Sequence, residues 1–193
     1  MALPVVLLRQ WRDGDLAGFC EMNADPEVMR FFPKPLTPSE SADMLARLRE
    51  GIERRGWGLW AVEADGRLAG LTGLAEPAFT SRFTPCVEIG WRLRREFWGR
   101  GIACRAACLA QSHAFDRLGL AELVSFTAGI NLPSRRLMER LGFARDPGDD
   151  FDHPWLPEGH PLRPHVLYRK RRPAGAEPAP QLSARKSVPR GRE

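Results

Sequence analysis

A strand, a glycine-containing turn and a helix follow one another between residues 86 and 118, and this order constrains the fold more than any other stretch of the chain. CVEIGWRL (residues 86–93) predicts the strand, and the helix is expected from about Gly101 to Leu118. Between them two glycines flank Arg100. The first N–H groups of a helix lack partners within it, and the helix dipole is positive there. Because glycine lets the backbone approach a ligand closely, the junction has the properties of an anion-binding site.

Two common phosphate-binding motifs do not fit this junction. A Walker loop requires GxxxxGK followed by Ser or Thr, and a dinucleotide-binding loop requires GxGxxG. The chain lacks the first pattern, and the second fails because Cys104 stands where the third glycine belongs. The junction is therefore either an anion-binding loop of another kind or a plain capped turn.

The rest of the chain predicts a mixed sheet covered by helices. Thr37 and Glu40 form a capping-box pattern at the start of a helix that ends at Gly56. Asp65 and Gly66 form the turn of a hairpin. The expected order is β-α-α-β-β-β-α-β-α-β. The other strands are expected at residues 5–11, 121–128 and 165–170, and the other helices at 13–22 and 131–142.

Length and charge predict one folded domain and a tail. The 193 residues are 43% hydrophobic, which is enough for one soluble domain with a core. Residues 1–169 contain 22 basic and 22 acidic residues, whereas residues 170–193 contain seven basic and two acidic ones. This Pro-, Ala- and Arg-rich end predicts a disordered basic tail, which cannot bury enough apolar surface to fold alone. No nucleic-acid partner is expected, although RNA binding by the tail is an alternative.

Several classes of protein are not expected from the sequence. No apolar run approaches the roughly 18 residues that a membrane span needs. The first residues show neither a basic leader nor a small-residue cleavage site, so the expected location is the cytoplasm. The four cysteines form no CxxC pair, and the histidines of the late Pro-rich loop lack ligand spacing, so no metal is expected.

Two segments resemble signatures of the GNAT acetyltransferase superfamily. WGRGIA (residues 98–103) is similar to the Q/R-x-x-G-x-G/A loop of that family, with Gly101 and Ala103 in the small positions and Trp98 departing from Gln or Arg. NLPSRRLMERLGF (residues 131–143) resembles the second signature, N-x-x-S/A followed by a helix ending in LGF. The resemblance covers about residues 1–169 and is greatest to the RimJ/RimL-like branch.

The resemblance implies the GNAT acyl-CoA N-acyltransferase fold, a single domain with a mixed α/β sheet and splayed central strands. It implies acetyl-CoA as cosubstrate, with its pantetheine arm paired to the backbone of Trp91, Arg92 and Leu93. Asn131 is expected to hydrogen-bond the same ligand, although a helix N-cap alone also predicts an asparagine there. The pyrophosphate is expected on Trp98, Gly99, Arg100, Gly101, Ile102 and Ala103.

The expected chemistry is attack of an amine on a thioester, for which the ammonium must first lose a proton. A carboxylate can accept that proton, often through a water molecule. Glu88 lies ten residues before Trp98, an offset similar to that of the base in the histone-acetylating branch. The alternatives are a solvent-facing strand residue or an ion-pair partner. Another branch has a glutamate where this chain has Phe126, so the acidic loop at 149–158 is the fallback source of a base.

The leaving thiolate is expected to take a proton from Ser134. Many members of the family use a tyrosine seven residues after the asparagine, and this chain has Met138 there. The only tyrosine, Tyr168, falls on the last predicted strand. The alternative role for Ser134 is a hydroxyl that satisfies the first helical turn.

The expected function is acetyl-CoA-dependent transfer of an acetyl group to a primary amine, in a monomer or homodimer. A peptide N-terminus, a lysine and a small amine all remain open as acceptors, because specificity in this fold lies in variable loops. Family analogy places Phe32 and Pro33 on the acceptor side. The alternative function is a non-catalytic CoA-binding module that acts as a sensor or interaction partner.

Overall fold

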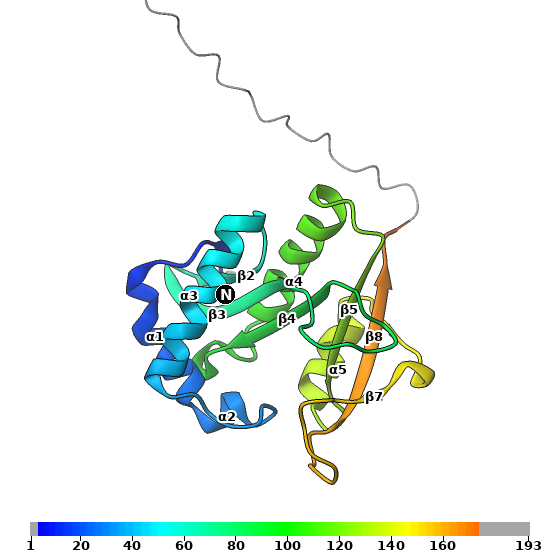
Figure 1. Cartoon of the computed structure of the whole chain (residues 1–193). Coiled ribbons are helices and arrows are strands. Elements are labelled where there is room, and N and C mark those ends of the chain that lie inside the picture. The colour runs from blue at the N-terminus through cyan, green and yellow to red at the C-terminus, as the bar shows by residue number, and fades with distance from the viewer. Residues whose placement is uncertain (1–3, 174–193) are drawn as a thin grey trace, which may run out of the picture.

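A single twisted sheet carries helices on both faces in the computed structural model, which describes residues 4–173 (Figure 1). Its strands run in the order β1-β2-β3-β4-β5-β8-β6, and β7 also pairs with β8. The strands are β1 (Val6–Arg9), β2 (Leu59–Ala64), β3 (Arg67–Ala75), β4 (Glu88–Leu93), β5 (Glu122–Ala128), β6 (Ala144–Arg145), β7 (Phe151–Asp152) and β8 (Pro164–Arg171).

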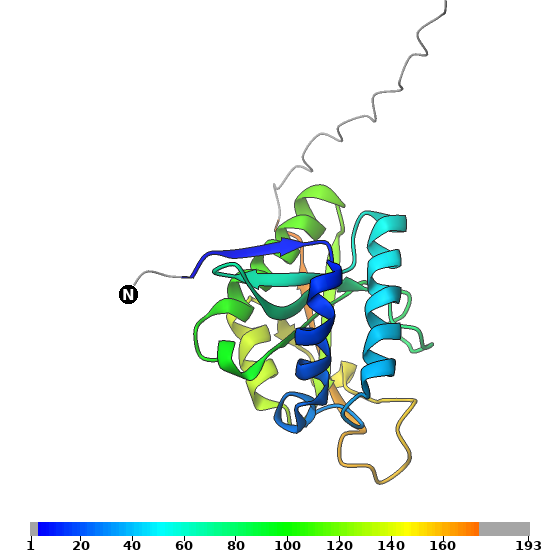
Figure 2. The ribbon, with the colours of Figure 1, turned by 90° about the vertical axis from the view of Figure 1, so that its left-hand side faces the viewer.

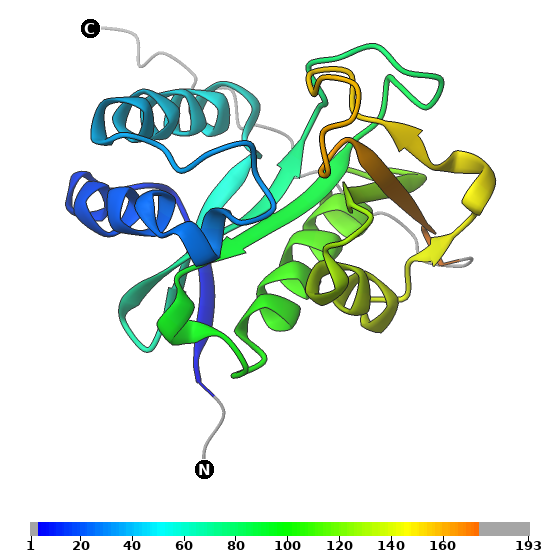
Figure 3. The ribbon, with the colours of Figure 1, turned by 90° about the horizontal axis from the view of Figure 1, so that it is seen from below.

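The helices form two layers, one on each face of the sheet. α1 and α3 lie side by side over one face, whereas α4 and α5 cover the other (Figures 2 and 3). The helices are α1 (Leu16–Ala24), α2 (Pro26–Met29), α3 (Pro38–Arg55), α4 (Ile102–Ser112) and α5 (Leu132–Arg140). The predicted mixed sheet covered by helices is therefore confirmed, and the structure places helices on both of its faces.

Local signals position α3 and the first hairpin as the sequence predicts. Thr37 Oγ1 accepts a hydrogen bond from the Glu40 N–H at 3.2 Å, and Glu40 Oε2 accepts one from the Thr37 N–H at 2.8 Å. Gly56 ends α3 in the left-handed conformation, with φ +77°. Asp65 and Gly66 turn β2 into β3 with φ angles of +49° and +78°, as a type I′ turn requires.

The two central strands, β4 and β5, pair only where they begin to lie side by side. They are parallel and share one register pair, Glu88 with Val124, and the Val124 N–H donates to the Val87 C=O at 3.0 Å. Past that pair β5 continues its ladder with β8 and β4 continues its ladder with β3. The predicted splay of the central strands is therefore present, and the splay comprises residues 89–93 of β4 and 125–128 of β5.

The structure differs from the sequence prediction at several boundaries. The helix expected to reach Leu118 stops being α-helical at Ser112 and continues as a π-helical turn over His113–Arg117. The loop after α5 contains the short strands β6 and β7. The last strand, β8, runs to Arg171, and the expected domain boundary at residue 169 stays a prediction. Most of the predicted tail, residues 174–193, lies outside the described residues.

Residues 4–173 were also expected to contain neither a membrane span nor a metal site. None of the helices there is both long and apolar enough to cross a bilayer. Within the same residues, no three side chains of His, Cys, Asp or Glu come together as a metal-binding group.

Candidate active site

The turn before α4 has the backbone of an anion-binding loop. Gly99 and Gly101 have φ angles of +71° and +72°, which glycine adopts without strain. A Cβ atom at either position would meet no atom within 4 Å, so the space beside the turn is open. No side chain of residues 4–173 caps the start of α4, and no acidic residue occupies its first turn. The first N–H groups of α4 are therefore available to an anion.

The residues around these glycines hold the turn in place. The Trp98 indole N–H donates to the Leu93 C=O at 2.9 Å, which ties the turn to the end of β4. Ile102 is buried in the core and Ala103 packs against it, so only their backbone faces a ligand at this turn. Arg100 is exposed, and its contact with an aspartate is a surface ion pair of 3.4 Å. Because such pairs are weak, the Arg100 guanidinium remains available to an anionic ligand.

The edge of β4 that faces the splay offers backbone groups to an extended ligand. The Ile89 C=O accepts a hydrogen bond from the Ser125 hydroxyl of β5 at 2.9 Å. Because backbone groups alternate sides along a strand, Trp91 and Leu93 direct theirs to the same edge, beyond the last ladder pair with β5. Arg92 directs its backbone toward β3 instead. The geometry thus places Trp91 and Leu93 for pairing with a ligand that lies along the strand.

Glu88 is the titratable side chain at the start of the splay. It has no hydrogen bond or ion pair among residues 4–173, and burial raises the pKa of its carboxyl to about 7. Gly90 lies next on the same face of β4, and a Cβ atom there would meet nothing within 4 Å. A carboxyl that titrates near neutral pH beside open space has the properties of a general base. These properties favour a proton-transfer role over that of an ion-pair partner.

Arg92 lies on the same face of β4 as Glu88, two residues beyond Gly90. Its Nη1 donates to Asn23 Oδ1 of α1 at 2.6 Å, and its guanidinium lies over the Phe32 ring, 4.0 Å from the centroid. Burial lowers the pKa of Arg92 to about 10. The sequence prediction assigns the Arg92 backbone to the cosubstrate. The structure shows that the Arg92 side chain points to the layer of α1 and α3.

Asn131, at the start of α5, is tied into a local hydrogen-bond network. Its Oδ1 accepts from the Ser134 N–H at 3.3 Å, which is the N-cap contact that the sequence predicts as an alternative. Its Nδ2 donates to Thr127 Oγ1 at 2.8 Å and to Ser134 Oγ at 3.1 Å. The network fixes the Ser134 oxygen as an acceptor, so the Ser134 hydroxyl proton is free to point elsewhere. The roles of Asn131 and Ser134 toward a ligand stay predictions.

Two positions that carry a tyrosine or a base elsewhere in the family, and the only tyrosine of the chain, have structural roles here. Met138 is 1% exposed and belongs to the core. Tyr168 donates to Glu139 Oε1 at 3.0 Å, on the face of the sheet that α5 covers. Phe126 packs against Phe79 and Phe151, with ring centroids 5.8 and 5.5 Å apart. These three residues therefore offer no acid or base to the splay.

Two loops meet over the face of the sheet that carries Glu88. Phe31, in the turn after α2, packs with Leu156 and Leu162 of the loop between β7 and β8 and with Ala128 of β5. Phe32 follows directly and stacks on Arg92. These loops close the site from the side opposite α4 and α5, where the sequence places acceptor-binding residues.

The acidic loop after α5 is less suited than Glu88 to act as a base. Asp149 Oδ2 lies 2.6 Å from Arg169 Nε, and Asp150 pairs with Arg145. The hydrogen bonds from these arginines lower the pKa of both carboxyls. A carboxylate stabilised in its charged form has a weaker affinity for a proton. Asp149 and Asp150 are therefore weaker bases than Glu88.

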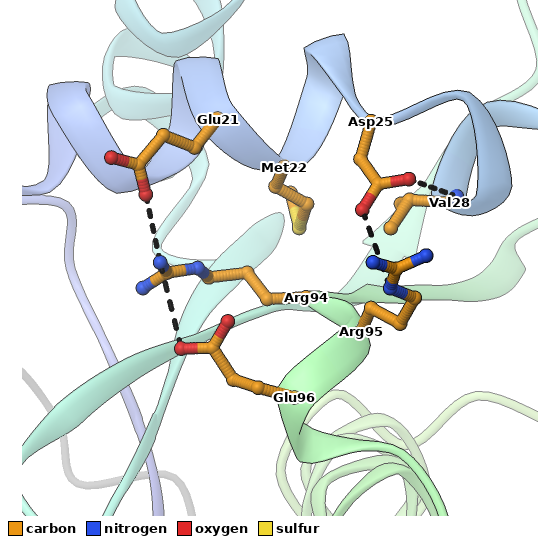
Figure 4. A pocket seen from close by; sticks show the side chains of 7 residues that line it. All are labelled: Glu21, Met22, Asp25, Val28, Arg94, Arg95 and Glu96. Carbon is orange, nitrogen blue, oxygen red and sulfur yellow. Dashed lines mark hydrogen bonds and ion pairs between the residues drawn. The ribbon is translucent and has the colours of Figure 1, made fainter.

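A hollow of about 320 Å³ lies between α1, α2 and the turn after β4 (Figure 4). Its charged side chains pair with one another across the hollow. Arg94 contacts Glu21 at 2.8 Å and Glu96 at 3.5 Å, and Arg95 contacts Asp25 at 3.8 Å (Figure 4). The hollow lies at the end of β4 remote from Glu88, and its charges are satisfied.

Sequence reasoning missed the contact between Arg92 and Asn23. The two residues are 69 positions apart, and neither lies in a pattern that predicts the pairing. The available signal is an arginine inside a strand that otherwise predicts burial, because an interior arginine needs a partner.

The splayed sheet and the uncapped start of α4 agree with the fold that the sequence resemblance implies. The Acetyltransferase (GNAT) domain model matches residues 6–144. The chain therefore belongs to the GNAT acetyltransferase family, whose cosubstrate is acetyl-CoA.

Relatives with known names agree with this family. FsC-acetyl coenzyme A-N(2)-transacetylase of Aspergillus fumigatus is 34% identical over 129 residues, which are 63% of this chain and 55% of that protein. The chain thus spans about half the length of this relative. Spermidine N(1)-acetyltransferase of Escherichia coli is 30% identical over 142 residues, which are 72% of this chain and 73% of that protein.

Solved structures confirm the fold. An acetyltransferase from Agrobacterium tumefaciens superimposes with a TM-score of 0.68 at 22% identity, over 89% of this chain and 96% of that one. Spermidine N-acetyltransferase from Vibrio cholerae, in complex with CoA and spermine, gives a TM-score of 0.68 at 20% identity, over 86% and 95%. The assignment to the RimJ/RimL-like branch stays a prediction.

Proposed function

We propose that this protein transfers the acetyl group of acetyl-CoA to a primary amine, with Glu88 as general base. The observation that carries the proposal is the position of Glu88 at the last pair between β4 and β5, with a pKa of about 7 and open space beside Gly90. The names of the relatives, which include a spermidine acetyltransferase and an N(2)-transacetylase, support an amine acceptor.

The turn before α4 and the edge of β4 are the proposed binding site for acetyl-CoA. The N–H groups of Gly101, Ile102 and Ala103 suit the pyrophosphate, because they are uncapped and lie at the positive end of the helix dipole. The backbone of Trp91 and the N–H of Leu93 suit the pantetheine amides. Bound in this way, acetyl-CoA supplies an activated acyl group at the splay.

Glu88 accepts the proton that the acceptor ammonium must lose before its nitrogen can attack. A base with a pKa near 7 is about half ionised at neutral pH and has a high affinity for a proton. The nitrogen lone pair forms the C–N bond, the C–S bond breaks as the thiolate leaves, and the nitrogen gives up a second proton, which balances the proton that the thiolate takes up. Ser134 is the proposed proton donor to that thiolate, which is a modest requirement since a thiol has a pKa of about 8.5.

The proposal has further parts. The protein belongs to the RimJ/RimL-like branch, lies in the cytoplasm and is a monomer or homodimer. It has a folded domain with a basic tail and no nucleic-acid partner, and Arg100 and Asn131 help to hold the cosubstrate. A peptide N-terminus, a lysine side chain and a small amine are all compatible with the site as acceptors.

The test combines a binding measurement with a turnover measurement. Acetyl-CoA at millimolar concentration should raise the melting temperature, because a ligand that binds only the folded state stabilises it. An amine panel with a free-thiol readout should show turnover that Glu88→Gln removes while the melting shift persists. Binding of CoA without turnover of any amine would favour the non-catalytic module, which the packing of Met138 leaves open.

A further inference from the structure

Arg92 is a cation on the face of β4 that α1 and α3 cover, and within residues 4–173 it has no anionic partner. Its Nη1 is used by Asn23, but its Nε is buried without a hydrogen-bond partner. It forms no ion pair with any carboxylate of residues 4–173. A buried arginine normally uses its donors on carboxylates or carbonyls, since an unsatisfied donor destabilises the fold. The guanidinium therefore has unused binding capacity.

The surroundings of Arg92 hold its side chain in one orientation. Asn23, on α1, is fully buried, and its Nδ2 donates to Ser41 Oγ of α3 at 3.3 Å. Phe32 covers one face of the guanidinium at 4.0 Å. Two helices and one loop thus fix a guanidinium whose Nε and Nη2 make no hydrogen bond within residues 4–173. The Nε and Nη2 edge is the side of arginine that binds a carboxylate with two parallel hydrogen bonds.

Arg92 and the proposed base share one face of one strand, with open space between them. A strand rises about 3.3 Å per residue, so the Cα atoms of Glu88 and Arg92 are about 13 Å apart. Gly90 lies midway, and a Cβ atom there would meet nothing within 4 Å. A small molecule lying over Gly90 therefore has a carboxylate at one end and a guanidinium at the other.

We propose that the acceptor is a small amine that also carries a carboxylate, which Arg92 binds while Glu88 takes the amine proton. This inference rests on the proposed function, because it names the substrate class of the same site. A polyamine would place a second cation near Arg92, which costs energy through like-charge repulsion. A polyamine would also need free carboxylates to bind its ammonium groups. Three carboxylates of the region after α5 are already paired with arginines, namely Asp149, Asp150 and Asp152.

The experiment compares amino acids with their methyl esters, in a series from glycine to 6-aminohexanoate. For the amino acid of the best chain length, kcat/KM of the wild type should exceed that of Arg92→Met by about 10- to 100-fold. This is the effect expected for a hydrogen-bonded pair of charged groups. The ester should change less than about threefold between the two proteins. The comparison is between variants, so the different amine pKa values of acid and ester cancel.

Two further variants control for folding and for general charge. Arg94→Met removes a neighbouring arginine that pairs with Glu21 and Glu96. This variant should have wild-type kcat/KM values for both the amino acid and its methyl ester. Arg92→Lys keeps the charge and should retain part of the preference for the acid. Melting temperatures and the acetyl-CoA shift should show that all variants fold.

Each outcome decides the inference. Equal loss for acid and ester in Arg92→Met, or no loss for either, overturns it while the proposed function stands. If no amine is turned over, the proposed function fails, and calorimetric titration of 6-aminohexanoate and glycine into the protein with CoA decides the inference alone. Binding that Arg92→Met abolishes and Arg94→Met preserves supports it, whereas binding of neither acid overturns it.

Discussion

Glu88 is expected to set the pH dependence of the reaction. Its carboxyl has a pKa of about 7 because burial disfavours the charged form. Below that pH the group is protonated and cannot accept a proton, so the rate should rise with pH through about 7. Glu88→Gln should lower kcat by about 10²–10⁴-fold and remove this limb of the profile, measured by thiol release. A profile with an unchanged limb in Glu88→Gln would place the base elsewhere.

The same carboxyl should make the fold less stable at alkaline pH. Because its folded pKa of about 7 exceeds the ordinary value of 4.5, the native state binds more protons than the unfolded state between these values. Stability that Glu88 contributes below pH 4.5 is therefore lost as the pH rises through 7. Relative to wild type, Glu88→Gln should gain about 1–2 kcal/mol between pH 4.5 and pH 8, discounted for partial exposure.

Urea unfolding at both pH values measures this gain. Glu158→Gln, at an exposed glutamate of the loop between β7 and β8, is the control and should show no such difference. An equal gain in both variants would mean that the effect belongs to net charge.

Asn131 is expected to act on stability through two separable contacts. Asn131→Ala removes the N-cap of α5 and should cost about 1 kcal/mol. Asn131→Asp keeps an acceptor for the Ser134 N–H but loses the Nδ2 donor to Thr127. Chemical denaturation should therefore place Asn131→Asp between wild type and the alanine variant. If the two variants were equally unstable, the contact with Thr127 would be the dominant one.

At the level of elements, the turn before α4 can be tested with a matched pair of glycines. Gly101 and Gly119 have φ angles of +72° and +68°, and a Cβ atom would meet nothing within 4 Å at either one. Alanine at each should cost about 1–2 kcal/mol of backbone strain. Only Gly101→Ala should also reduce the acetyl-CoA melting shift, because only Gly101 borders the proposed pyrophosphate site. Equal shifts in both variants would remove this turn from the binding site.

The elements that sequence predicted well are those whose signals are local. The capping box of Thr37 and Glu40 and the turn at Asp65 each lie within a few residues, and the structure shows both. The family motif likewise located the glycine turn before α4 from adjacent residues. In each case the backbone geometry follows from residue types that are neighbours in sequence.

Elements that depend on distant partners were predicted less well. The strands β6 and β7 contain two residues each and exist because β8 provides a partner for both. The π-helical turn at His113–Arg117 follows a regular apolar pattern that does not distinguish it from α-helix. The contact between Arg92 and Asn23 joins β4 to α1, so it is fixed by tertiary packing, which no local pattern encodes.

In the whole molecule, the sheet separates two sets of contacts that meet at the splay. The turn before α4 and the residues Asn131 and Ser134 belong to the layer of α4 and α5 (Figure 3). Arg92 and Phe32 belong to the layer of α1 and α3. This arrangement suits the proposed direct transfer, in which the two substrates approach the same point from opposite faces.

Direct transfer predicts that both substrates are bound at once and that no acetyl-enzyme forms. Cys86, two residues before Glu88, is the cysteine nearest in sequence to the proposed base, and burial raises the pKa of its thiol to about 11. Since the thiolate is the nucleophile, this residue is not primed for acyl transfer. Double-reciprocal plots should therefore intersect, and Cys86→Ala should keep wild-type kcat within about twofold. Parallel plots, or a mass increase of one acetyl group on protein incubated with acetyl-CoA alone, would show instead that the acetyl group passes through the enzyme.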